Sequence, residues 1–159
     1  GAIIGYTVEE FNQLTDWILE KVPLSYIAIA SWGQNIYLNK VRAEGPNEGR
    51  LINEVVHEHL AGRVPLMATG GINSIEKSRE AIIHAEMVGL SSVFVAEPDF
   101  VAKFQENREE DINLDVGVDD IERLAIPKAA FKDIVLMMDY GKSLPQHTRD
   151  EFRKLEENY

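Results

Sequence analysis

Residues 64–100 contain two consecutive strand-to-helix units, which constrain the fold more than any other feature of the chain. In the first unit an apolar run at 64–69 ends in Gly70-Gly71, and in the second an apolar run at 87–90 ends in Ser91-Ser92. Small residues at the carboxyl end of a parallel strand leave backbone N–H groups accessible to a ligand, usually a phosphate. The two units therefore predict a parallel sheet with an anion-binding edge.

Helical patterns and apolar runs also alternate in the first 92 residues. Thr7 and Glu10 have the spacing of a capping box and predict a helix from residue 8. The predicted elements are helix 8–22, strand 26–30, a loop at 34–50, helix 51–61, strand 64–69, helix 74–85 capped by Asn73, and strand 87–90. Because the strands are apolar throughout, the pattern indicates a parallel sheet covered by helices, with strand side chains divided between two buried faces.

The remainder of the chain is different in character. A short helix is predicted at 98–105, an acidic surface loop at 106–120, and two further helices at about 128–139 and 146–157. We therefore divide the chain into a sheet-containing part, residues 1–105, and an acidic loop with C-terminal helices, residues 106–159.

Two small-residue strand ends in succession are typical of strands seven and eight of a (β/α)8 TIM barrel, where a phosphate site is often built. A complete barrel needs at least about 200 residues, and this chain has 159. The predicted fold is therefore α/β, the C-terminal part of such a barrel.

Charge and composition exclude several classes of partner. The formal net charge of −11 argues against binding nucleic acid or an anionic membrane surface. No apolar run approaches a membrane span, no signal peptide is recognisable, and cysteine is absent, which together predict an intracellular, cytoplasmic protein. His57 and His59 point about 200° apart on a helix, so we predict no metal site.

The order of motifs resembles the C-terminal part of the old yellow enzyme family, especially its bacterial NADH-dependent flavin oxidoreductases. The matching segments are Ser31-Trp32-Gly33, a strand from Pro65 to Gly-Gly-Ile at Ile72, Ala85-Glu86-Met87-Val88, and Glu97-Pro98-Asp99-Phe100. The likeness covers roughly residues 7–135 and is strongest over 64–104.

This resemblance implies strands six to eight of a flavin-binding barrel and the segments that follow them. It also implies an enzyme that passes hydride from NAD(P)H through FMN to a small electron-poor acceptor. The residues expected at the FMN site are Gly70, Gly71, Ser91, Ser92 and Trp32. The family usually has Gly-Arg where this chain has Ser91-Ser92, so the arginine that holds the FMN phosphate is missing.

The family's catalytic residues lie on and after the fourth strand, which has no counterpart here, so no residue of this chain is predicted to be catalytic. We expect the chain to be the C-terminal half of the enzyme and inactive alone. Two alternatives remain open: a barrel enzyme that binds a phosphorylated substrate without flavin, and a non-catalytic half-barrel that serves assembly. Unpaired sheet edges predict a homodimer or larger assembly.

Overall fold

The centre of the molecule is a three-stranded parallel sheet in the order β1-β2-β3. Its strands are β1 (Ile27–Ile29), β2 (Leu66–Thr69) and β3 (Met87–Gly89). This computed structural model describes residues 5–31, 33–115, 120–130, 133–137, 142 and 144–156. The predicted α/β class and parallel sheet are confirmed, whereas the numbering of these strands as six to eight of a barrel stays a prediction.

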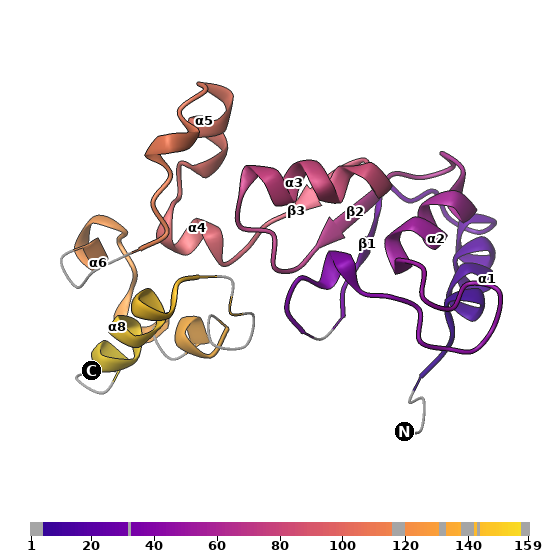
Figure 1. Cartoon of the computed structure of the whole chain (residues 1–159), viewed down its shortest axis with the longest axis horizontal. Helices are drawn as coiled ribbons and strands as arrows, with labels where there is room; N and C mark the ends of the chain where they lie inside the picture. The colour runs from indigo at the N-terminus through magenta and orange to yellow at the C-terminus, as the bar shows by residue number, and fades with distance from the viewer. Residues whose placement is uncertain are drawn as a thin grey trace.

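Helices precede and connect the strands, as the sequence predicts (Figure 1). They are α1 (Val8–Leu19), α2 (Ile52–Leu60) and α3 (Ile75–Ala81). The capping box of α1 forms: the Glu10 N–H donates to the Thr7 hydroxyl over 3.2 Å, and the Thr7 N–H donates to the Glu10 carboxylate over 2.7 Å. This local motif satisfies two backbone donors at the helix start.

The third helix differs from its prediction at both ends. Its N-cap is Ser74, whose hydroxyl accepts the Lys77 N–H over 3.2 Å, and not Asn73. After Ala81 the helix tightens into a 3-10 turn, η2 (Ile82–His84). A regular helix through residue 85 would continue the apolar face of Ile75 and Ala81 to Ile82, but after this change of period Ile82 is 51% exposed.

One face of the sheet packs against the helices and carries most of the strands' large apolar residues. Strand register places Ile27 and Ile29 beside Leu66 and Ala68, and all four lie in one core cluster, to which Val88 also packs. Strand side chains do divide between two faces, but these large apolar ones all lie on the same face, because residues two apart point the same way. The opposite face carries mainly smaller or more flexible side chains: Ala28, Met67, Thr69, Met87 and Gly89.

A second apolar cluster lies among the elements that follow β3. Those elements are α4 (Val93–Ala96), α5 (Phe100–Gln105), η3 (Glu109–Asp111), α6 (Asp120–Arg123), η4 (Lys128–Ala130), a helix at 133–137 and α8 (Gln146–Glu156). Ala96 of α4 packs with Leu144 and Phe152 in this second cluster. Figure 1 places α6 and α8 at the opposite end of the molecule from α1 and α2.

The amino edge of the sheet is held by a carboxylate. Glu86 accepts the Leu66 N–H over 2.7 Å through one oxygen and contacts His57 Nε2 at 2.9 Å through the other. The Leu66 hydrogen bond is the main reason that the pKa of Glu86 is lowered, although burial opposes it. Glu86 therefore links α2, β2 and β3 at the edge away from the predicted ligand site.

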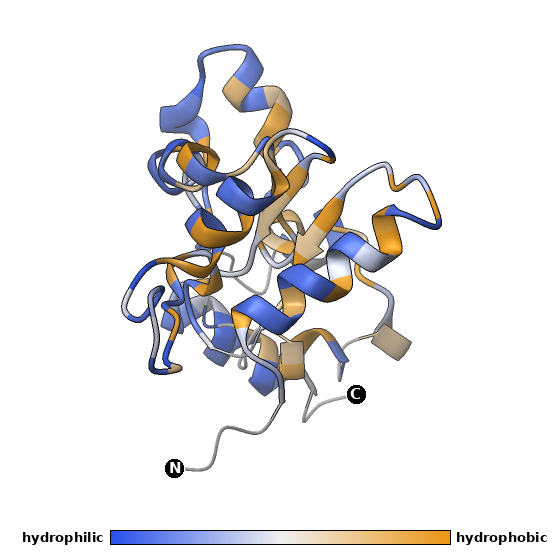
Figure 2. Ribbon diagram, turned by 90° about the vertical axis from the view of Figure 1, so that its right-hand side faces the viewer, coloured by the Kyte–Doolittle hydropathy of each residue, from blue (hydrophilic) through white to orange (hydrophobic). Residues whose placement is uncertain are grey.

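Figure 2 shows helices with mixed hydrophilic and hydrophobic surfaces around strands that are mainly hydrophobic. Within the described residues, no helix is long and apolar enough to cross a membrane.

Candidate functional site

Four of the predicted site residues follow neighbouring strand ends. Gly70-Gly71 comes directly after β2, and Ser91-Ser92 comes two residues after β3. Thr69 and Gly89 are register partners in the parallel β2–β3 pair, so both segments leave the sheet at its carboxyl edge. Ligands of parallel α/β sheets bind at this edge. Trp32, the fifth predicted residue, lies outside the described residues.

The two glycines permit a very close approach of a neighbouring loop. Gly70 and Gly71 have φ of +86° and +80°, where side chains are strained. A Cβ on Gly71 would lie 2.4 Å from the Asn35 backbone nitrogen, and one on Gly70 would lie 2.5 Å from the Ile36 side chain. The Gly-Gly turn is thus packed under the loop that follows β1, which is itself a structural reason for glycine at both positions.

The two serines differ in exposure. Ser91 is exposed, whereas Ser92 is 9% exposed and stands at the start of α4 without a side-chain bond to that helix. Within the described part of the chain, the Ser92 hydroxyl has no hydrogen-bond partner. A hydroxyl that no protein group contacts can donate to or accept from a polar ligand group, so this position fits one.

A lysine side chain also lies at the carboxyl edge of the sheet. The Lys77 ammonium donates to Asn35 Oδ1 over 3.1 Å and to the Gly71 carbonyl over 3.2 Å. Lys77 comes from the first turn of α3, and its two acceptors come from the loops after β1 and β2. Only the tertiary fold brings these groups together, so no local sequence pattern indicates the contact.

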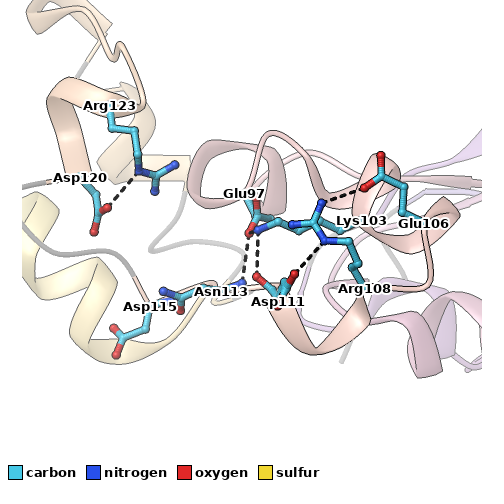
Figure 3. Close-up of polar contacts among 9 residues, drawn as sticks. All are labelled: Glu97, Lys103, Glu106, Arg108, Asp111, Asn113, Asp115, Asp120 and Arg123. Atoms are coloured by element: carbon cyan, nitrogen blue, oxygen red, sulfur yellow. Dashed lines mark hydrogen bonds and ion pairs between the residues drawn. The ribbon is translucent and has the colours of Figure 1, made fainter.

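The first residue of the Glu97-Pro98-Asp99-Phe100 motif forms an ion pair with a lysine of α5. Glu97 is 5% exposed and forms an ion pair with Lys103, while also accepting the Asn113 N–H over 3.1 Å. Figure 3 shows these groups converging, and Lys103 also donates to the Asp111 carbonyl over 2.9 Å. Glu97 therefore joins the acidic segment, residues 106–120, to Lys103 of α5. A favourable charge near the start of α5 does not explain why this carboxylate is buried.

The two histidines of α2 have separate partners. His57 contacts Glu86, and His59 Nε2 lies 2.9 Å from Asp16, which also pairs with Arg63. Among the residues that the structure describes, no group of three or more acidic or histidine side chains is arranged to hold a metal ion.

Comparison with known proteins places the chain among relatives named as oxidoreductases. It is 49% identical over all 159 residues to an uncharacterized oxidoreductase of Streptococcus pyogenes serotype M5. It is 26% identical over 132 residues to a probable NADH-dependent flavin oxidoreductase of Bacillus subtilis, a match covering 82% of this chain. No family model matches.

These relatives confirm the resemblance that the motifs indicate: the chain is related to oxidoreductases, and more distantly to an NADH-dependent flavin oxidoreductase. The matches span only 40% and 34% of the length of these two relatives.

Proposed function

We propose that this chain supplies the FMN-phosphate edge of a flavin oxidoreductase built on a (β/α)8 barrel, while other segments supply the catalytic residues. The observation that carries the proposal is the alignment of Gly70-Gly71 and Ser92 at one edge of a parallel sheet, in a chain related to oxidoreductases. When bound, FMN would accept hydride from NAD(P)H and pass it to an electron-poor acceptor.

The residues present fit a phosphate group. The Ser92 hydroxyl lacks a partner among the described residues, and a phosphate oxygen would provide one. Gly70 and Gly71 let the loop after β1 pack closely on this turn, which fixes the backbone at the carboxyl edge of the sheet. The proposed role of these residues is to bind and orient the cofactor.

The test is spectroscopic and uses the full-length gene product. We expect a yellow protein whose bound flavin is bleached by NADH or NADPH and recovers its colour when an electron-poor acceptor is added. A colourless full-length protein that nevertheless binds a phosphosugar or nucleotide would favour the second candidate, a phosphorylated substrate held by the same loops without flavin.

The 159-residue chain by itself is expected to purify without flavin. In the proposed arrangement this chain contacts only the phosphate of FMN, and the segments that hold the ring lie elsewhere in the enzyme, so the chain alone retains too few contacts to keep the flavin. Gel filtration followed by absorbance measures this directly, and stoichiometric flavin in the protein peak would contradict the expectation.

We also propose that the isolated chain self-associates. β1 and β3 are the edge strands of the described sheet, and α1 exposes Leu14, Trp17 and Ile18 by 42%, 56% and 38%. Burying an apolar side chain of this size is worth about 1.5–3 kcal/mol. Light scattering at low micromolar concentration should give a mass above 17.9 kDa.

A charged residue on the exposed face of α1 provides the control for this measurement. Trp17→Glu should lower the measured mass, because a carboxylate on this exposed apolar face opposes its burial in an assembly. A wild-type chain that scatters as a 17.9 kDa monomer would exclude self-association.

A further inference from the structure

Lys77 places a positive charge at the carboxyl edge of the sheet. Its ammonium contacts Asn35 Oδ1 and the Gly71 carbonyl, at 3.1 and 3.2 Å, in the loops after β1 and β2. Both contacts are part-buried. The lysine is thus fixed at the turn that is expected to approach a ligand.

Both of these acceptors are uncharged. Within the described residues Lys77 forms no ion pair, although the chain has 27 acidic residues and 16 lysines and arginines. Other partly buried cations are neutralised: Lys103 pairs with Glu97, and Arg50 pairs with Glu54 and Glu58. A partly buried charge is costly unless it is paired, so the position favours an anion beside Lys77.

An ammonium group has three N–H donors, and the two neutral contacts occupy two of them. One donor and the full charge remain for an anionic oxygen. Lysine is an established phosphate-binding residue that acts as a point charge on a flexible stem. Ser92, at the same edge, contributes a hydroxyl but no charge.

We propose that Lys77 binds the phosphate at this edge and supplies the positive charge that Ser91-Ser92 lacks. The identification of that phosphate as the one in FMN rests on the proposed function. The charge on Lys77, rather than its hydrogen bonds to Asn35 and Gly71, is the property that the phosphate requires.

The experiment compares FMN with riboflavin, which lacks the phosphate, by flavin fluorescence titration of the full-length apoprotein. Lys77→Gln keeps amide donors for Asn35 and Gly71 but removes the charge, and should weaken FMN binding roughly 10-fold or more. Riboflavin binding should be unchanged. Lys77→Arg should retain the preference for FMN.

Lys21→Gln is the matched control. Lys21 is exposed just after α1 and before β1 begins, and its replacement removes the same charge without affecting the proposed site. If Lys77→Gln leaves the preference for FMN intact, the phosphate is held elsewhere and the inference is wrong while the flavin proposal stands.

Titration with inorganic phosphate, followed by ³¹P NMR, separates the remaining outcomes. Phosphate binding that depends on Lys77, in a protein that binds neither flavin, would support the lysine site and overturn the flavin proposal. No binding of phosphate, FMN or riboflavin to the wild-type protein would overturn both.

Discussion

Replacing Glu97 with alanine should destabilise the fold by about 3–5 kcal/mol, because it leaves the Lys103 ammonium with a buried, unpaired charge. The side chains of Glu97 and Lys103 are only 6% and 17% exposed. The change also removes the acceptor of the Asn113 N–H (Figure 3). That hydrogen bond holds the acidic segment, residues 106–120, against the turn before α5. Urea unfolding followed by circular dichroism measures the loss.

An exposed ion pair in the same segment provides the control. Glu106 pairs with Arg108, and their side chains are 58% and 50% exposed, so Glu106→Ala should cost no more than about 1 kcal/mol. Similar losses from the two substitutions would show that the Glu97 pair contributes no more than a surface contact.

The Glu97 pair should also make stability depend on pH. Burial raises the pKa of Glu97, but the hydrogen bonds from Lys103 and the Asn113 backbone outweigh burial, and the pKa lies below its ordinary 4.5. The stabilisation is therefore present above about pH 4.5 and is lost as pH falls through the lower folded-state pKa. The difference in unfolding free energy between wild type and Glu97→Ala should therefore decrease as the pH falls below about 4.5.

Features set by neighbouring residues could be predicted from the sequence. The capping box at Thr7 and Glu10 forms as expected, because both partners lie within one helical turn. The strand cores also form where apolar runs end in small residues, because those runs need burial and the small residues permit tight turns. Short elements such as α4, four residues long, carry too few residues to show a helical period.

Features that depend on distant contacts could not be predicted. Lys77 meets Asn35 across 42 positions of sequence, and its placement follows from the turn geometry of Gly70-Gly71. Glu97 and Lys103 are six positions apart, outside the i,i+4 spacing of a helix pair, and they meet because the chain turns at Pro98 and Asp99 before α5 begins. In both cases the charged group is recognisable in the sequence but its partner is not.

Replacing Gly71 with alanine should destabilise the fold by roughly 3–5 kcal/mol, since it combines backbone strain with overpacking. The new Cβ would lie 2.4 Å from the Asn35 backbone nitrogen and 2.7 Å from its Cα, at a φ of +80°. Gly49 is the control, because it has nearly the same φ, +79°, and a methyl group added there would meet no heavy atom within 4 Å. Gly49→Ala should therefore lower the unfolding free energy by the backbone strain alone, about 1–2 kcal/mol. The difference between the two unfolding free energies, measured in urea, reports the close approach of the loops after β1 and β2. Equal losses of unfolding free energy would mean that the loop containing Asn35 moves away from the new Cβ at no cost. Asn35 would then not hold the Lys77 ammonium in a fixed position at this edge.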